Sequence, residues 1–396
     1  MRRNQLRYTL LQLLFRYGAT SRPEIQQHTS IRQGTILEEV NFLKKRGVIL
    51  ETARTAKHTG RKASPLTLNP DFFWLAGIDF QIQKTLGVIT DFTGRILYTV
   101  EIPALSRKSL SDCRNEVREI LRLLREKAGE NWEKVSGIGF ADPGLVNVGE
   151  GRSIRAVHIP TWEDAATGKW LENEYKVPAG ILPECMVKTF MEFLTRGREM
   201  KGSLFHLGMN EGIGGGFINP EGECFTGDTN QAMEIGHIVI DPNGPLCQCG
   251  SRGCLEAIAG KRGILRKAYE VIQSGVDTVM ELSEGEDFSL RQFGEWAKKD
   301  KAARIISGNV SRSIGHALAV VVSLLNPSTI VLSGELTVLG ELLMEPVKEV
   351  LHVSCFADAL KELKIEFSKL EENDTARGAA ILMRNKLIFS GRIPLQ

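Results

Sequence analysis

Four residues in the second half of the chain have the types and the spacing of a metal site. They follow the pattern H-x9-C-x-C-x4-C and are His237, Cys247, Cys249 and Cys254. Three thiolates and one imidazole form a tetrahedral ligand set for Zn²⁺, and a site closed by four protein ligands is structural rather than catalytic. The alternative is a group of buried cysteines without a metal, which the close spacing disfavours.

The other cysteines do not indicate disulfide bonds. The chain contains seven cysteines, an odd number. Its first residues, MRRNQLRYTLLQLLFRYG, repeat arginine among apolar residues, and no small-residue cleavage site of a secretory signal follows. No stretch approaches the roughly 20 uncharged apolar residues that cross a bilayer. We therefore expect a cytoplasmic protein with reduced thiols and no membrane partner.

Charge is distributed unevenly along the chain. The 396 residues carry a net charge of +2, with 42% hydrophobic and 25% charged residues, which is typical of a globular protein. Residues 1–69 contain 13 lysines and arginines and four acidic residues, a net charge of +9 that leaves −7 for the rest. This basic segment indicates a polyanionic partner, unless its charges simply form a solvated surface.

The basic segment has the pattern of a winged helix-turn-helix. An apolar face with helical spacing predicts a first helix over residues 6–17. Ser21 and Glu24 form a capping box before a short second helix, and a third helix is expected over residues 32–46, stopped by Gly47. Residues 48–51 and 66–68 then predict two strands. Two helices joined by a tight turn place the second one in the major groove of double-stranded DNA.

The start of the third helix carries side chains that distinguish base pairs. Arg32, Gln33 and Thr35 lie in its first turn. Arginine pairs with guanine, glutamine pairs with adenine, and the threonine methyl contacts the methyl group of thymine. The loop between the two strands is basic, and we expect Arg61 and Lys62 near its tip to contact phosphates or the adjacent minor groove.

After about residue 70 the chain alternates between strands and helices, which is typical of an α/β fold. Residues 75–80 and 86–90 are expected to pair, and a similar strand pair with a glycine-bearing loop begins at residue 204. The repetition predicts two similar lobes around a cleft. The glycine-rich run 212–216 either cradles a phosphate, lets the backbone approach a sugar, or forms a tight hairpin.

The zinc pattern and its surroundings resemble the ROK family, which contains repressors and sugar kinases. The resemblance rests on residues 234–237, 247–256 and 374–380, and it extends over nearly the whole chain. It implies an actin-like fold of the sugar kinase and ribonuclease H type, and a homodimer or homotetramer. It also implies that Glu234, His237 and Glu256 contact the hydroxyl groups of a sugar, with His237 serving the metal.

The sequence departs from the family's kinases at the positions that handle ATP. Those kinases have D-x-G-x-T after the first strand, whereas Asp79 is followed by Gln81 and Ile82 with no glycine nearby. Glu184 takes the position of the catalytic base, but proline and methionine replace the asparagines around it. Glu211, before the glycine run, places a negative charge where ATP phosphates would bind. We therefore expect no kinase activity.

Together these patterns predict a repressor-type transcription regulator of carbohydrate uptake or catabolism genes that responds to a sugar or sugar derivative. One alternative is an ATP-dependent sugar kinase of the glucokinase or N-acetylhexosamine kinase type, with or without a regulatory function. Another alternative is a transcription regulator that is controlled by a partner protein rather than by a sugar. The expected domains are a DNA-binding domain at residues 1–70 and two lobes at residues 71–195 and 196–396, with a last helix that can return to the first lobe.

Overall fold

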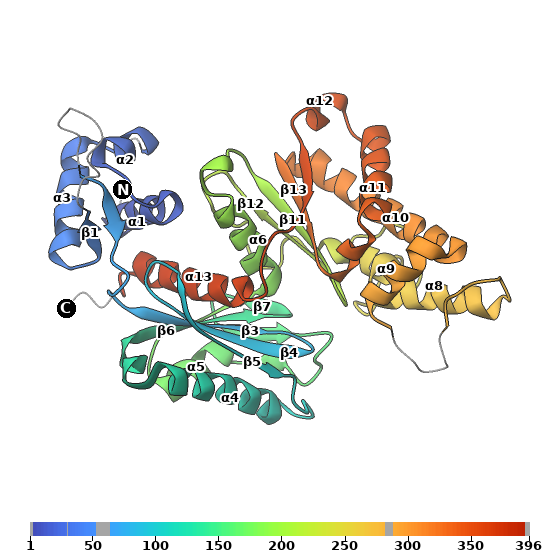
Figure 1. The fold of residues 1–396 in the computed structure, drawn as a ribbon, viewed down its shortest axis with the longest axis horizontal. Coiled ribbons are helices and arrows are strands. Elements are labelled where there is room, and N and C mark those ends of the chain that lie inside the picture. The colour runs from blue at the N-terminus through green and yellow to red at the C-terminus, as the bar shows by residue number, and fades with distance from the viewer. Residues whose placement is uncertain (1–2, 30, 53–63, 282–287, 393–396) are drawn as a thin grey trace. The chain divides into compact units, whose positions relative to one another are not determined.

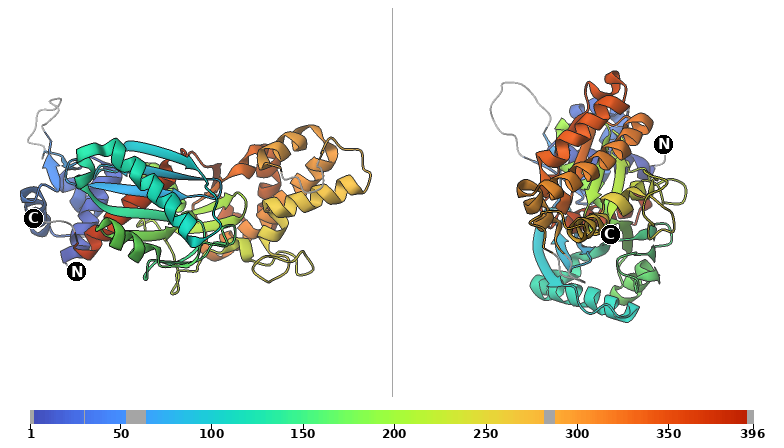
Figure 2. Two further views of the ribbon diagram at one scale, coloured as in Figure 1. Left: turned by 90° about the horizontal axis from the view of Figure 1, so that it is seen from below. Right: turned by 90° about the vertical axis from the view of Figure 1, so that its right-hand side faces the viewer.

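The chain folds into two compact units, which Figures 1 and 2 show as ribbons. The computed structural model describes residues 3–29, 31–52, 64–281 and 288–392. The first unit comprises Met1–Glu199 and Glu371–Gln396, and the second comprises Met200–Leu370. The last segment of the chain therefore belongs to the same unit as the first.

The first unit begins with a winged helix-turn-helix head (blue in Figure 1). Its elements are α1 (Arg3–Tyr17), α2 (Arg22–His28), α3 (Gln33–Lys45), β1 (Ile49–Glu51) and β2 (Leu66–Leu68). The two strands pair in antiparallel fashion, with Ile49 opposite Leu68. Leu10, Ile25 and Ile36, one from each helix, are buried in a common core. The helix-turn-helix and the strand pair expected from the sequence are confirmed.

The rest of the first unit is built on a five-stranded sheet with the order β10-β6-β3-β4-β5. The strands are β3 (Trp74–Phe80), β4 (Lys84–Thr90), β5 (Ile96–Pro103), β6 (Val135–Asp142) and β10 (Ala179–Pro183). β3 and β4 are antiparallel with Leu75 opposite Thr90, as the sequence predicts, and β6 and β10 continue the sheet in parallel. A small second sheet contains β7 (Leu145–Asn147), β8 (Arg152–Arg155) and β9 (Glu163–Ala165).

Helices cover both faces of the five-stranded sheet, with α4 (Leu110–Ala128) on one and α13 (Asp374–Ser390) on the other (Figure 1). Glycines allow the close approach of α13, because a Cβ at Gly77 would lie 1.9 Å from the carbonyl oxygen of Ala376. The remaining helices of this unit are η1 (Gly129–Lys134), α5 (Thr167–Tyr175), α6 (Glu184–Thr195) and η2 (Gly197–Glu199).

The head and α13 share a hydrophobic core within the first unit. The buried guanidinium of Arg384 lies 3.7 Å from the ring centroid of Phe15 on α1 and donates a hydrogen bond to the carbonyl of Phe92 at 2.8 Å. The rings of Tyr8 and Phe389 meet edge to face at 5.6 Å. One helix therefore packs both on the sheet and on the DNA-binding head.

The second unit contains a four-stranded sheet with the order β12-β11-β13-β14. Its strands are β11 (Leu204–Met209), β12 (Ile213–Ile218), β13 (Thr329–Ser333) and β14 (Lys364–Phe367). Its helices are η3 (Ile235–His237), α7 (Leu255–Ala259), α8 (Lys261–Gln273), α9 (Leu290–Lys299), α10 (Lys301–Leu325), η4 (Glu335–Leu339), α11 (Glu341–Ser354) and α12 (Ala357–Leu360). A lobe in each unit, with a mixed sheet and covering helices, agrees with the predicted α/β class.

The glycine-rich run forms part of a hairpin. β11 and β12 are antiparallel, and the backbone N–H of Asn210 donates to the carbonyl of Gly212 at 3.0 Å in the turn between them. Close packing explains the glycine at position 215, because a Cβ there would lie 2.9 Å from the side chain of Ile235. The tight hairpin expected for this run is confirmed.

Among the described helices, α10 has the length and composition of a membrane-spanning segment. However, 61% of its most apolar 18-residue stretch is buried within the protein. Its buried residues, which include Ile314 and Leu318, belong to the hydrophobic core of the second unit. That burial is the pattern of a core helix.

Candidate functional sites: a DNA-binding head, a metal cluster and two carboxylate groups

The helix-turn-helix is held in shape by capping and by ion pairs. The carboxylate of Glu24 accepts from the backbone N–H of Ser21 at 2.7 Å, and the Ser21 side chain accepts from the backbone N–H of Glu24. This capping box satisfies backbone donors at the start of α2. Glu51 on β1 forms ion pairs with Arg22 on α2 and with Lys44 at the end of α3. The carboxylate of Glu51 thus ties three elements of the head together.

The predicted base-contacting side chains lie at an accessible helix start. Arg32 is the N-cap residue of α3, and Gln33 and Thr35 follow it in the first turn; all three are exposed. The opposite side of α3 is anchored in the head by Ile36 and Val40, which are buried. Arg61 and Lys62, the predicted wing contacts, lie outside the described residues.

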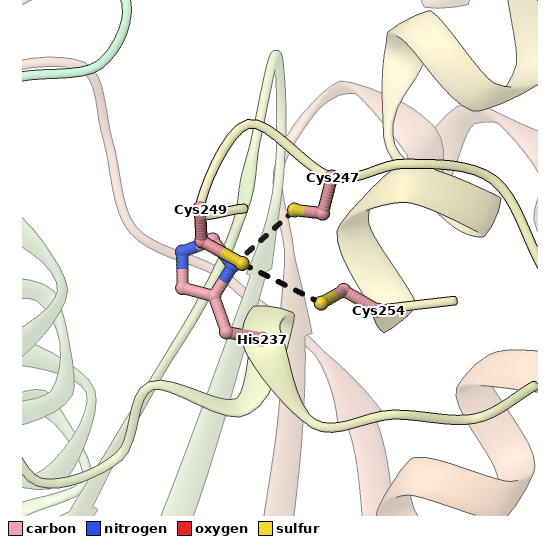
Figure 3. Close-up of side chains that lie close together, drawn as sticks. All are labelled: His237, Cys247, Cys249 and Cys254. Atoms are coloured by element: carbon pink, nitrogen blue, oxygen red, sulfur yellow. Dashed lines mark hydrogen bonds between the residues drawn. The ribbon is translucent and has the colours of Figure 1, made fainter. Parts of the chain in front are cut away.

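The four predicted metal ligands converge in the second unit, as Figure 3 shows. His237 ends η3, Cys247 and Cys249 lie on the following turn, and Cys254 caps the N-terminus of α7. Gly253 permits this turn: it has φ of +68°, and a Cβ there would lie 1.5 Å from the carbonyl oxygen of Asp241. The spacing in the sequence and the turn together bring one nitrogen and three sulfurs to one point.

The dimensions of this cluster suit a zinc ion. The ligand atoms all lie within 4.8 Å of one another, and two of the pairs, Cys247 Sγ with His237 Nδ1 and Cys249 Sγ with Cys254 Sγ, are 3.7 Å apart. A tetrahedron with Zn–S bonds of about 2.3 Å has edges of about 3.8 Å. The cluster could therefore hold a metal ion with little rearrangement.

The residues that the family resemblance assigns to a sugar lie beside the metal cluster. The backbone N–H of His237 donates to the carbonyl of Glu234 at 3.0 Å, and Glu256 lies in α7 directly after Cys254 and Leu255. The Glu256 carboxylate accepts from the backbone N–H of Ile213 at 2.9 Å, which fixes it against the start of β12. Desolvation of the Glu234 carboxyl raises its pKa; the charge of His237 acts in the opposite direction, and the charge of Glu256 adds to the rise. The Glu234 carboxyl thus lies within electrostatic reach of both His237 and Glu256.

In the first unit, Glu184 occupies the first position of α6 and forms an ion pair with Lys188 one turn later. The sequence analysis did not consider Lys188, although its spacing of four residues from Glu184 is a recognisable signal for an ion pair on a helix. Lys188 also acts electrostatically on the buried Asp79. The carboxylate at the predicted base position is therefore engaged by a cation of the same helix.

Asp79 is the residue before the last in β3 and is fully buried. Its Oδ2 accepts from the side-chain amide of Gln81 at 2.6 Å, whereas its Oδ1 has no hydrogen-bond partner among the described residues. Burial, together with the nearby charge of Glu184, raises the pKa of Asp79 to about 7.

The turn that follows Asp79 is held by side chains of its own unit. Arg107 donates to the carbonyl of Ile82 at 3.1 Å, and its guanidinium pairs with the buried Glu116 at 2.6 Å. The same guanidinium lies 4.2 Å from the ring centroid of Phe80. The guanidinium of Arg107 therefore links this turn to Glu116 on α4 and to Phe80 at the end of β3.

One electrostatic expectation needs correction. Glu211 was expected to present a free negative charge before the glycine run. Lys261, at the start of α8, lies with its Nζ 2.7 Å from the Glu211 carboxylate and is nearly buried. The charge of Glu211 is largely balanced, so repulsion by this residue is a weak argument against phosphate binding.

Comparisons with known proteins place these features in context. The ROK family model matches residues 75–386. The chain is 24% identical over 392 residues to the putative xylose repressor of Caldicellulosiruptor sp. strain Rt8B.4, covering 96% of each chain. It is 23% identical to the DNA-binding transcriptional dual regulator NagC of Escherichia coli K12, covering 95% of this chain and 91% of the other.

Two solved structures show the likeness of the fold. A ROK family transcriptional regulator, a homologue of the E. coli MLC protein, superposes with a TM-score of 0.83 at 21% identity, covering 98% of this chain and 97% of the other. A glucokinase from Streptomyces griseus, in complex with glucose and AMPPNP, superposes with a TM-score of 0.66 at 22% identity. The glucokinase match covers 78% of this chain and 99% of that enzyme.

Proposed function

Because the chain belongs to the ROK family, we propose that it is a DNA-binding transcription repressor whose affinity for its operator is controlled by a sugar or a sugar derivative. The observation that carries this proposal is the presence of a helix-turn-helix head in addition to the ROK body. The glucokinase structure matches 78% of the chain, whereas the transcriptional regulator matches 98%. The relatives named as repressors of xylose and N-acetylglucosamine genes support a role in carbohydrate uptake or catabolism.

In this proposal the head binds the major groove through Arg32, Gln33 and Thr35, and Arg61 and Lys62 add contacts from the wing. The exposure of Arg32, Gln33 and Thr35 at the start of α3 supports their proposed contacts with bases. Heads of a dimer contact half-sites about one helical turn, or a multiple of it, apart. We therefore propose a cytoplasmic homodimer or homotetramer, with residues 1–70 as the DNA-binding domain and residues 71–195 and 196–396 as the lobes that respond to the effector, where the last helix, α13, returns to the first lobe.

The effector is proposed to bind at Glu234, His237 and Glu256. Carboxylates suit sugars because they accept hydrogen bonds from hydroxyl groups. The structural Zn²⁺ would be held by His237 and the three cysteines, where it would fix the turn between η3 and α7. Since His237 would bind the metal through one ring nitrogen, the other remains available for a hydrogen bond. The metal cluster would thus orient the effector site without taking part in any reaction.

We further propose that the chain is not an enzyme. Support comes from the ion pair between Glu184 and Lys188 and from the hydrogen bond of Gln81 to Asp79, because both engage carboxylates that a kinase needs for proton transfer or for metal-bound phosphates. The alternative, a sugar kinase, is supported by the similarity of the fold to that of the glucokinase. Sugar-dependent ATP turnover that disappears in Glu184→Gln would favour this alternative.

The repressor proposal is tested by selecting double-stranded DNA from a random-sequence pool with the full-length protein. We expect an enriched, roughly palindromic site that is protected in footprinting. A panel of pentoses, hexoses, amino sugars and their phosphates is then added to the complex. A true effector changes DNA affinity, because it has different affinities for the two states of the protein. Failure to enrich any sequence would contradict the proposal, and a complex that no sugar alters would favour control by a partner protein.

A further inference from the structure

The DNA-facing side of α3 extends beyond its first turn. The side that packs into the head contains Ile36, Val40 and Leu43, all buried. Since successive helix residues are about 100° apart, the opposite side centres on residues 34, 38, 41 and 45. All four of these positions are exposed, and Leu37 lies beside them with 48% of its surface accessible.

Gly34 has no explanation within the fold. It lies in the first turn of α3 with an ordinary helical backbone, and a Cβ built there would meet no described atom within 4 Å. Glycine weakens a helix relative to alanine, so an exposed glycine with room for a side chain destabilises α3 without improving its packing. The missing side chain does leave room for an external surface to approach the backbone of α3 closely.

Two exposed residues in the turn after Gly34 are unsuited to phosphates. Leu37, one turn further on, is apolar, and Glu38 carries a negative charge that phosphates repel. Base edges offer partners to both kinds of side chain, since thymine presents a methyl group and cytosine an amino donor in the major groove. This part of α3 is therefore suited to the interior of the groove rather than to its rim.

We propose that Leu37 packs against the C5-methyl group of a thymine in each operator half-site, in the space that Gly34 leaves open. This inference rests on the proposed DNA-binding function and names a specificity determinant within it. Apolar contact is how proteins recognise this methyl group, which distinguishes thymine from the other bases in the major groove. Leu37 would thus add a second thymine contact, one turn further along α3, to the one expected of Thr35.

The methyl contact is tested by replacing thymine with uracil, which removes only the methyl group. The DNA selected by the wild-type protein is synthesised with uracil at each thymine in turn, symmetrically in both half-sites. For the wild-type protein we expect a roughly fourfold loss of affinity per half-site at the thymine that Leu37 contacts, the effect of burying about one methylene-sized group; a thymine contacted by Thr35 should be sensitive to uracil in Leu37→Ala as well. Leu37→Ala should bind the thymine operator correspondingly more weakly and should be insensitive to uracil at that position.

A matched control is Leu105→Ala, because Leu105 is also 48% exposed but lies outside the head. This variant should show the same uracil penalty as the wild type. A uracil penalty that Leu37→Ala retains in full, or a wild-type protein that is insensitive to uracil at every position, would overturn the inference while leaving the repressor proposal intact. A random pool that yields no enriched sequence would overturn both.

The space at Gly34 is tested separately with Gly34→Ala. Alanine should raise the unfolding midpoint slightly, because it favours the helix, yet lower operator affinity at least tenfold, because its methyl group occupies the space next to the DNA. Gly308→Ala is the matched control, since Gly308 lies in α10 and an added Cβ would be 3.5 Å from its nearest neighbour, Arg312. It should stabilise the protein without affecting DNA binding. Unchanged operator affinity in Gly34→Ala would contradict the close approach.

Discussion

Cys249 is the exposed member of the metal cluster, whereas Cys247 and Cys254 are buried. We expect purified protein to contain about one Zn²⁺ per chain and Cys249→Ser to lose it, because serine does not replace a thiolate as a ligand. The apparent stability of the second unit should fall as well, since metal binding contributes directly to folding free energy. Elemental analysis and thermal unfolding with and without a chelator measure both effects.

Cys355→Ser provides the control for the metal prediction. Cys355 is half-buried and lies at the end of α11, outside the cluster. This variant should retain its zinc and respond to the chelator as the wild type does. Metal-free wild-type protein that still binds operator DNA and melts at an unchanged temperature would show that the four residues are ordinary packing residues.

The raised pKa of Asp79 leads us to expect that the stability of the protein depends on pH. Its pKa in the folded protein is raised to about 7 from its ordinary value of 3.8, mainly by burial. Between these values the folded protein binds a proton that the unfolded chain does not, so the contribution of Asp79 is present at low pH and lost as pH rises through about 7. The shift corresponds to a loss of at most about 4 kcal/mol of unfolding free energy across this window.

Asp79→Asn removes this titration and should flatten the pH profile. Urea unfolding at about pH 5 and about pH 8 should show a smaller loss of stability in the variant than in the wild type. The control is Asp164→Asn, because the Asp164 side chain is 77% exposed and its charge remains solvated in the folded protein. Identical pH profiles for Asp79→Asn and the wild type would show that Asp79 stays ionised.

Site residues that lie close together in the sequence could be predicted from local patterns, whereas interactions between residues far apart in the sequence could not. The metal ligands could be predicted because all four lie within residues 237–254, so their convergence needs only two turns. The electrostatic effect of Lys188 on Asp79 could not, because the two residues are more than 100 positions apart and come close only in the folded protein. Burial of the Asp79 carboxyl, which raises its pKa, also depends on tertiary packing that no local pattern reports.

Among the secondary-structure elements, α13 depends most on close packing. It lies on the sheet where Gly77 and Gly139 leave room, and a Cβ at either position would lie about 2 Å from a backbone oxygen of α13. We expect Gly77→Ala to lower the unfolding free energy by about 3 kcal/mol, because the backbone of a helix yields less easily than a side chain. Urea denaturation measures this loss.

Gly149→Ala is the matched control for α13. Gly149 lies in an exposed loop, and an added Cβ would be 3.5 Å from the side chain of Asn147, an ordinary contact. The unfolding free energy of the Gly149→Ala variant should stay within about 0.5 kcal/mol of the wild-type value. A similarly small effect of Gly77→Ala would mean that α13 and β3 are not packed as closely as the structure indicates.

The elements themselves follow largely from the sequence. Apolar periodicity, the capping box at Ser21 and the alternation of strands and helices predicted the head and the strand pair β3–β4. A last helix that returns to the first lobe was expected, but its close packing on Gly77 and Gly139 was not, because a glycine in a strand does not show which distant helix approaches it. The hairpin at the glycine run was ambiguous because glycines suit both a ligand-binding loop and a tight turn.

For the molecule as a whole, the separation of charge is the main electrostatic feature. The basic N-terminal segment carries +9 and the rest −7. Several cations of the head are already paired with acidic groups of the head itself, as Arg7 is with Glu39 and Lys44 with Glu51. The number of lysines and arginines available to phosphates is therefore smaller than the net charge implies, and this number determines how strongly salt weakens DNA binding.

If about three phosphate contacts form per head, a dimer makes about six, and the logarithm of affinity should fall with a slope of about −5 against the logarithm of salt concentration. Operator affinity would then drop roughly 10³-fold between about 50 mM and 200 mM salt. Lys45 on α3 is exposed and well placed for a phosphate, so Lys45→Gln should reduce the slope by about 2 in the dimer. Lys44→Gln should reduce it less, because Glu51 already holds Lys44. Equal slopes for both variants would mean that the internal ion pair opens when DNA binds.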